Sequence, residues 1–194
     1  AQQPPFEVSI NGEDVPHKLF TFFIMPGEPL NISANTAFDL GTHGMGVTRR
    51  SDSKYTIKAP QKPGAYTVIL VKDADRVILN LLVLTPLDNQ KGEFLNGYRI
   101  GEYPEKLFND DPIYAKPKGL FEVTAETENL QLTPNFNMRQ FLSAQEGAFP
   151  KYLIIRERLL LKLEYLLAVV QLKQIAISTF SFVDGYRTPY YNEI

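Results

Sequence analysis

The chain has 194 residues, of which 44% are hydrophobic and 12% aromatic, so it is long enough to bury one large or two small cores. Its formal net charge of −2 gives no electrostatic reason to expect binding to nucleic acid or to an anionic membrane surface. Charged residues interrupt the long apolar stretches, so no membrane span is expected. The chain contains no cysteine, which leaves its redox compartment open.

Short β-type runs separated by turn residues predict an all-β sandwich over residues 1–86. Two sets of side chains alternate along residues 65–71, so one set is expected to face a core. The Pro-Gly turn and tyrosine of residues 59–66 resemble an element of the immunoglobulin-like modules of extracellular bacterial proteins. The expected strands are 6–10, 19–25, 30–34, 54–58, 64–71 and 76–84.

Residues 36–52 hold three glycines and the adjacent Arg49 and Arg50. They lack the Lys-Ser/Thr pair and the strand–loop–helix setting of a phosphate-binding loop, so we expect a flexible loop of the sandwich. The two arginines are expected at an exposed edge, and binding of an acidic polymer is the alternative. His43 in this loop and His17 before it are expected to be solvated, with a ligand contact as the alternative.

Residues 87–131 predict a structured connector, since prolines punctuate it and its aromatic residues are too numerous for a disordered linker. Those aromatic side chains are expected to pack against both neighbouring domains. Residues 96–104 (NGYRIGEYP) resemble a stretch that precedes the peptidase region of some exported wall enzymes. A structural aromatic clasp is the preferred interpretation, with a substrate groove as the alternative. The acidic residues nearby lack the spacing of a calcium loop.

Two helices and one strand are predicted after the connector. A short helix over residues 138–144 would be capped by Asn135 or Asn137. A long helix over residues 152–170, with Pro150 in its first turn, shows an apolar stripe that we expect to be buried. The stripe consists of Ile155, Leu159, Leu163, Leu166, Leu167 and Val170, widened by Leu160 and Leu161, with Glu164 among the surface residues. Residues 175–183 predict a strand that feeds a turn at 184–185.

The chain then reads Asp184-Gly-Tyr-Arg-Thr-Pro-Tyr-Tyr-Asn192. This stretch resembles the GYR-[ST]-P-x-x-N motif of the zinc D-alanyl-D-alanine carboxypeptidases and their relatives, the M15 peptidases. Residues 132–145 and 152–170 are similar to the opening segment and core helix of that family. The resemblance implies that Arg187 is catalytic, binding the substrate carbonyl and stabilising the charge that develops on it. It also implies that Tyr186 and Asn192 bind substrate.

In the resembled family, zinc is held by His and Asp residues that follow the arginine, and a Glu acts as base. This chain has two histidines, both in its first quarter, so no metal ligand is assigned and zinc is expected only for a complete family member. We therefore expect multidomain architecture: an immunoglobulin-like sandwich followed by an incomplete α+β domain of the DD-peptidase/Hedgehog-like type over residues 132–194. A longer chain, a truncated or processed product, or a partner chain in a homodimer or domain exchange would each explain the incompleteness.

The function expected from the resemblance is that of a zinc peptidase-like protein directed at peptidoglycan, which hydrolyses D,D- or L,D-type amides of wall peptides. The 194 residues by themselves are expected to be inactive. The start at Ala1 without Met is typical of an exported protein after signal removal, or of a trimmed chain, and the expected location is periplasmic or extracellular. The alternative function is a non-catalytic extracellular binding or adhesion module that binds a wall polymer or another protein.

Overall fold

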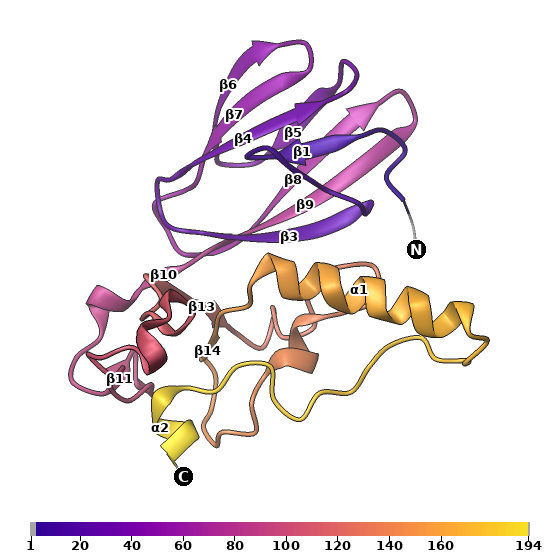
Figure 1. The fold of residues 1–194 in the computed structure, drawn as a ribbon. Helices are drawn as coiled ribbons and strands as arrows, with labels where there is room; N and C mark the ends of the chain where they lie inside the picture. Colours follow the sequence, from indigo (N-terminus) through magenta and orange to yellow (C-terminus); the bar gives the residue numbers. More distant parts are fainter. Residues whose placement is uncertain (1–2, 194) are drawn as a thin grey trace.

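The computed structural model describes residues 3–193 and places a two-sheet β-sandwich against a second half that carries the helices (Figure 1). One sheet has the order β2-β1-β4-β7-β6 and the other β3-β9-β8-β5. All pairings are antiparallel except that of β3 with β9. The strands are β1 (Val8–Ile10), β2 (Glu13–Asp14), β3 (Leu19–Ile24), β4 (Pro29–Ala34), β5 (Asp39–Thr42), β6 (Gly46–Ser51), β7 (Lys54–Lys58), β8 (Gly64–Lys72) and β9 (Asp75–Val83).

The sandwich follows from the alternation seen in the sequence. Each of the six predicted β runs contains a strand, and in β8 the side chains of Val68 and Leu70 are fully buried while Thr67 is exposed. The turn between β1 and β2 uses Asn11 at φ 52° and Gly12 at φ 85°, the positive values that a tight hairpin requires. The chain is thus mostly β-sheet with few helices.

The flexible loop predicted for residues 36–52 is wrong, because this stretch forms β5 and β6. Both lie at sheet edges, where β5 pairs with β8 and β6 pairs with β7, and cross-strand pairing there overrides the low β-propensity of glycine. The solvated position predicted for His17 is also wrong: its side chain is buried, and its ring stacks on Phe20 with centroids 6.4 Å apart.

The second half contains a small sheet, a hairpin and two α-helices. The sheet has the order β10-β13-β14, and β11 and β12 form the hairpin. The elements of the second half are β10 (Thr85–Pro86), β11 (Phe94–Leu95), β12 (Tyr98–Arg99), β13 (Gly119–Val123), β14 (Lys151–Leu153), α1 (Glu157–Leu172) and α2 (Pro189–Glu193), with 3-10 turns η1 (Leu87–Asn89), η2 (Phe108–Asp110), η3 (Pro112–Tyr114) and η4 (Met138–Phe141). In the part of the chain that the structure describes, no helix has both the length and the apolar character to cross a membrane.

Two helix boundaries differ from the prediction. The long helix begins at Glu157, because Tyr152 and Leu153 belong to β14 and pair with β13 instead. Pro150 therefore precedes a strand, joined to Phe149 by a cis peptide bond, and is not in a helical turn. The helix predicted over residues 138–144 is the shorter 3-10 turn η4, whose cap is Asn137: its side chain accepts from the Gln140 amide, and the Gln140 side chain accepts from the Asn137 amide.

The buried face of α1 is rotated relative to the predicted stripe. Leu160 and Leu167 are buried as expected, but Leu159 and Leu166 are 40% and 49% exposed. Glu164, which we expected on the surface, is buried. Its carboxylate accepts hydrogen bonds from the backbone and the side-chain amide of Asn135 at 2.9 and 2.6 Å. This polar contact with the segment before η4 fixes the rotation of the helix, which the apolar spacing alone does not encode.

The strand predicted over residues 175–183 is wrong, since the structure gives this segment no regular secondary structure. The segment packs by its aromatic rings instead. Phe180 stacks on Phe136 with centroids 5.9 Å apart, and Phe182 stacks on Phe141 at 4.9 Å. No strand of the described residues pairs with it, so its β-propensity finds no ladder.

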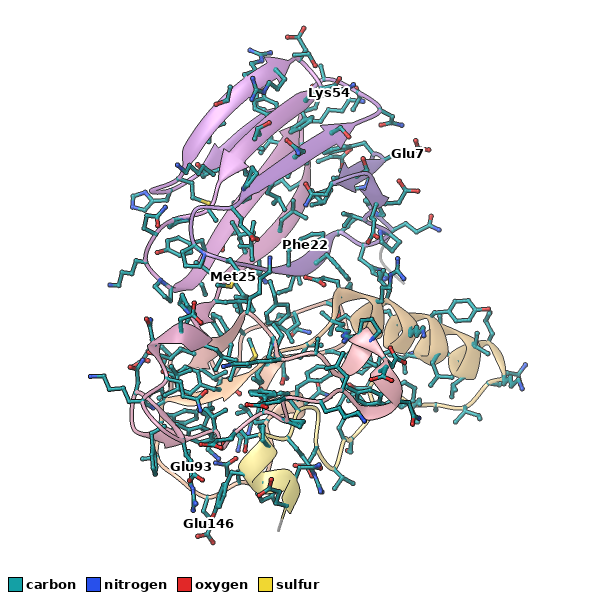
Figure 2. The ribbon with its side chains drawn as sticks, turned by 60° about the vertical axis from the view of Figure 1, so that its left-hand side comes forward. Glu7, Phe22, Met25, Lys54, Glu93 and Glu146 are labelled. Atoms are coloured by element: carbon teal, nitrogen blue, oxygen red, sulfur yellow. The ribbon has the colours of Figure 1, made fainter. Side chains whose placement is uncertain are left out.

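The sandwich and the second half are joined by specific polar contacts. The buried Thr21 of β3 donates to the Leu132 carbonyl at 2.8 Å, and Asn80 of β9 donates to the adjacent Gln131 carbonyl at 2.7 Å. Figure 2 shows Met25, which directly follows β3, at the boundary with the second half, where its sulfur lies beside Gly119. One hydrophobic cluster runs from the sandwich through Phe121 to α1, so the two halves share a core.

Candidate functional site

The two motifs singled out in the sequence lie against each other. The Tyr190 amide donates to the Ile100 carbonyl at 3.0 Å, and the Arg99 guanidinium lies 4.0 Å from the centroid of the Tyr190 ring. Gly101 permits this approach: its φ is 82°, and a Cβ built there would lie 2.6 Å from the Tyr190 nitrogen. Residues 96–104 thus form the structural clasp that the sequence predicted, and its partner is the GYR motif.

Tyr186 points into this clasp. Its hydroxyl is hydrogen-bonded to the hydroxyl of Tyr103, and burial raises the pKa of both phenols. Both phenols are therefore neutral at physiological pH, so either hydroxyl can be the donor in this hydrogen bond. The structure therefore places Tyr186, predicted to bind substrate, in a contact between the connector and the motif.

Arg187 is held in one orientation by Asp184. Its Nε and Nη2 donate to Asp184 Oδ2 at 2.9 and 2.8 Å, and its guanidinium carbon lies 5.4 Å from the Tyr191 ring centroid. The hydrogen bond from Arg187 lowers the pKa of Asp184. The Asp184 side chain is 8% exposed and also accepts from the Ala144 amide through Oδ1, whereas the Arg187 side chain is 46% exposed. The arginine thus faces solvent from a buried anchor.

Arg187 and Asn192 line the same groove, which has a volume of about 1080 Å³. One wall comes from the GYR motif and α2, and the other from the last residues of the clasp and the connector that follows it. The connector contributes Glu102, Tyr103, Glu105, Lys106, Leu107 and Asn109. Two predicted site residues therefore meet at one groove, with cations and carboxylates on its walls, as a site for a zwitterionic ligand requires.

A buried series of hydrogen bonds joins the GYR motif beside the groove to the clasp. Thr188 Oγ1 donates to Gln145 Oε1 at 2.7 Å, and Gln145 Nε2 donates to the Arg99 carbonyl at 2.8 Å. The same threonine oxygen accepts from the Tyr191 amide at 3.1 Å and so caps α2. Gly185 lies so close to η4 that a Cβ would approach Phe141 to 2.7 Å. The motif is thus fixed on three sides.

Sequence reasoning did not identify Asp184 or Gln145 as supporting residues. The signal for Asp184 was present, since an acidic residue stands three positions before Arg187 in a turn. Gln145 lies 43 positions from Thr188, and no local pattern marks it.

The side chains present do not fit a zinc ion. His17 is buried in the sandwich, His43 is exposed at its surface, and the chain has no cysteine. Within residues 3–193, no three His, Cys, Asp or Glu side chains gather closely enough to hold a metal. No catalytic step through zinc is therefore assigned to these residues.

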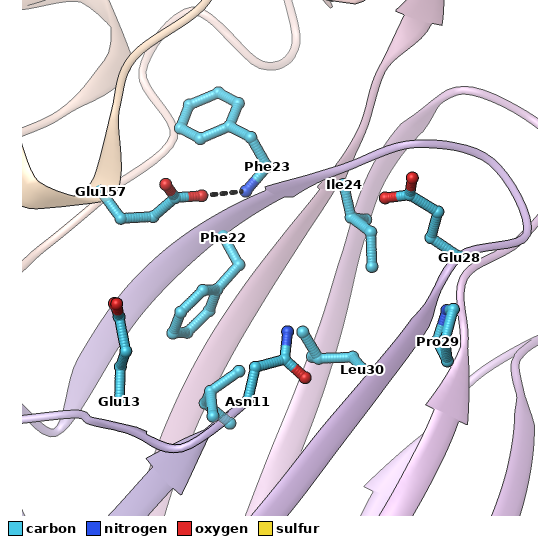
Figure 3. A pocket seen from close by; sticks show the side chains of 10 residues that line it. Asn11, Glu13, Phe22, Phe23, Ile24, Glu28, Pro29, Leu30 and Glu157 are labelled. Atoms are coloured by element: carbon cyan, nitrogen blue, oxygen red, sulfur yellow. Dashed lines mark hydrogen bonds between the residues drawn. The ribbon is translucent and has the colours of Figure 1, made fainter. Parts of the chain in front are cut away.

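A smaller cavity of about 330 Å³ opens beside β3 (Figure 3). Its carboxylates are already engaged: Glu157 accepts from the Phe23 amide at 3.0 Å, and Glu13 pairs with Arg158 at 3.5 Å. The contact with Glu157 satisfies a backbone amide on the outer edge of β3, so these acids stabilise the sandwich edge.

No protein-family model, curated protein or solved structure matches this chain.

Proposed function

We propose that the groove beside Arg187 binds the stem peptides of peptidoglycan, and that residues 132–194 are the front part of an M15-like zinc peptidase domain in a periplasmic or extracellular protein. The observation that carries the proposal is the placement of Arg187, anchored by Asp184, in the same groove as Asn192. Both positions match the GYR-[ST]-P-x-x-N pattern of that family. We also propose that the N-terminal sandwich is immunoglobulin-like.

The arrangement suits recognition of a peptide carbonyl or carboxylate. Among the hydrogen bonds of the described residues, Arg187 uses Nε and Nη2, so Nη1 remains to donate to a ligand oxygen. A guanidinium that is already fixed loses little side-chain entropy on binding. In a peptidase, the same donor would stabilise the negative charge that develops on the carbonyl oxygen. From the 194 residues themselves we expect binding without hydrolysis.

Titration of the protein with acetyl-L-lysyl-D-alanyl-D-alanine, followed by calorimetry, tests this function. Removing a charged hydrogen bond costs about 1.5–3 kcal/mol, so Arg187→Ala should weaken binding by roughly ten- to 150-fold. Arg76→Ala, on the exposed turn side of β9, is the control for loss of one positive charge and should bind like the unaltered protein. Equal affinities of the Arg187→Ala variant and the unaltered protein would refute the proposal.

The second candidate function, a non-catalytic binding or adhesion module, is favoured by a polar hollow on the sandwich that is lined by Asn31, Arg50, Lys54 and Thr56. The two functions are separated by a chelator, because adhesion should be indifferent to it and peptidase activity of a completed enzyme should be lost.

Self-association or chain exchange belongs to the same proposal. Tyr165, Leu172 and Val183 are 74%, 83% and 88% exposed, and all three lie on α1 or on the irregular segment that follows it. Exposed apolar side chains on these two consecutive segments support an interface with another chain. Sedimentation velocity at increasing protein concentration should show a dimer that Leu172→Glu abolishes, and a monomer at every concentration would overturn this part.

A further inference from the structure

The outer face of the five-stranded sheet carries a cross-strand network of polar side chains. Tyr55 and Ile32 lie opposite each other and are buried, so their neighbours Thr56 and Asn31 point outward. Arg50 Nε donates to Thr56 Oγ1 at 3.3 Å, and the Thr56 hydroxyl donates to Asn31 Oδ1 at 2.9 Å. The network therefore links β6, β7 and β4 on a face with small side chains.

A β-bulge brings Arg50 into this network. The register of β6 against β7 passes from Arg49 opposite Tyr55 to Ser51 opposite Lys54, so Arg50 is the extra residue. Bulges of this kind redirect a side chain and are frequent next to functional sites. Arg49 pairs with Asp52 at 2.7 Å, whereas neither Arg50 nor Lys54 has an ion pair among the described residues. The bulge thus separates an ion-paired arginine from an arginine available to a ligand.

These side chains surround a hollow of about 590 Å³. Apart from the buried Ile32 and Tyr55, the lining side chains carry two cations, two amides and two hydroxyls, from Arg50, Lys54, Asn11, Asn31, Ser33 and Thr56. No carboxylate belongs to the lining, so the positive charge is not neutralised there. The hollow offers cationic donors for an anion beside neutral donors and acceptors for hydroxyl groups.

We infer that this hollow binds an anionic polysaccharide. The acidic groups of the polymer would pair with Arg50 and Lys54, and its hydroxyl groups would bond to Asn31, Ser33 and Thr56. The aromatic ring of Tyr55 is buried, so the hollow presents no stacking surface for nucleic-acid bases. The carboxylates of an acidic peptide would pair with the cations, but its acidic side chains have no hydroxyl groups to bond to Asn31, Ser33 and Thr56. The inference does not rest on the peptide groove: Figure 2 shows Lys54 at the opposite end of the molecule from Glu93 and Glu146.

Binding of the full chain to polygalacturonate, dextran sulfate and uncharged dextran, measured by biolayer interferometry, tests this inference. Polygalacturonate and dextran sulfate separate carboxylated from sulfated ligands, and at least one should bind while dextran does not. The double variant Arg50→Gln with Lys54→Gln should weaken binding at least tenfold. Lys72→Gln with Arg76→Gln removes the same charge from the β8–β9 turn of the other sheet and should change binding less than twofold.

Two results would overturn the inference. Equal losses in both double variants would mean that overall charge alone is responsible. Equal or tighter binding of poly-L-glutamate or of single-stranded DNA would assign the hollow to another class of macromolecule. Asn31→Leu, which leaves both cations in place, should weaken polysaccharide binding and leave poly-L-glutamate binding unchanged. Arg187→Ala should leave polysaccharide binding intact, so failure of this site and failure of the peptide groove are distinguishable.

Discussion

Asp184 sets the direction in which Arg187 faces. Both guanidinium donors meet a single carboxylate oxygen, at 2.9 and 2.8 Å, and the other oxygen of that carboxylate accepts from the Ala144 backbone. The pair therefore ties the GYR motif to the segment after η4 while leaving the arginine in contact with the groove. Asp184 does not line the groove, so it would act on a ligand there only through Arg187.

Asp184→Asn should weaken binding of the D-alanyl-D-alanine peptide by about two- to fivefold, the range expected from a half-exposed ion pair. The loss is smaller than that of Arg187→Ala because the guanidinium is still present and only its orientation is released. Asp52→Asn is the matched control, since it removes the carboxylate of a comparable i,i+3 pair with Arg49 on the sandwich. Peptide affinity that is equal in the two Asp→Asn variants would contradict a positioning role for Asp184.

Gly101→Ala should destabilise the protein more than Gly97→Ala. Both glycines have positive φ, 82° and 85°, so both substitutions carry the backbone cost of roughly 1–2 kcal/mol. A Cβ at Gly97 meets open space, whereas one at Gly101 would press on the Tyr190 backbone at 2.6 Å. The difference between their urea midpoints isolates the close approach of the two motifs, and midpoints that coincide would show that the clasp adapts without cost.

Gln145→Leu and Thr188→Val should each lower the free energy of unfolding by about 1–3 kcal/mol, because each leaves a buried polar partner unsatisfied. The double variant should cost less than the sum of the single variants. A double-mutant cycle from urea titrations measures this coupling. Additive costs would mean that the two side chains do not depend on each other. Thr42→Val, on the edge strand β5, is the control for loss of a hydroxyl group that takes no part in these hydrogen bonds.

His17 should make stability fall in mild acid. Burial lowers the pKa of His17 below its usual value of 6.5, so the unfolded chain takes up the proton first as pH decreases. The stability that depends on neutral His17 is fully present above pH 6.5 and is lost as pH falls toward the lower folded-state pKa. Urea midpoints at pH 7.5 and 5.5 should differ less in His17→Leu than in the unaltered protein. His43→Asn, on the exposed turn, should preserve the difference.

The sequence predicted the sandwich well where its strands alternate. Val68 and Leu70 show the pattern, because every second residue of a strand faces the space between the two sheets and is apolar there. The edge strands β5 and β6 were not predicted, because their glycines and charged residues are typical of a loop. Their strand conformation depends on pairing with β8 and β7.

The second half was harder to predict because its contacts are long-range. The apolar spacing located α1 but could not reveal that Glu164 turns inward. Its carboxylate does so because it accepts a hydrogen bond from Asn135, 29 positions earlier. The GYR motif located Arg187 and Asn192 in one groove, while the clasp around Tyr186 and Tyr103 joins residues 83 positions apart. Such pairs leave no local period in the sequence.

The contacts of Thr21 and Asn80 with two adjacent carbonyls, those of Leu132 and Gln131, leave the sandwich and the groove-bearing half little freedom to turn against each other. The polar hollow and the groove beside Arg187 therefore keep a constant separation. A wall fragment that carried both a sugar chain and a stem peptide at that separation would meet the second site at high effective concentration once the first was occupied. Avidity for such a fragment would then depend on the spacing of its two groups as much as on either contact.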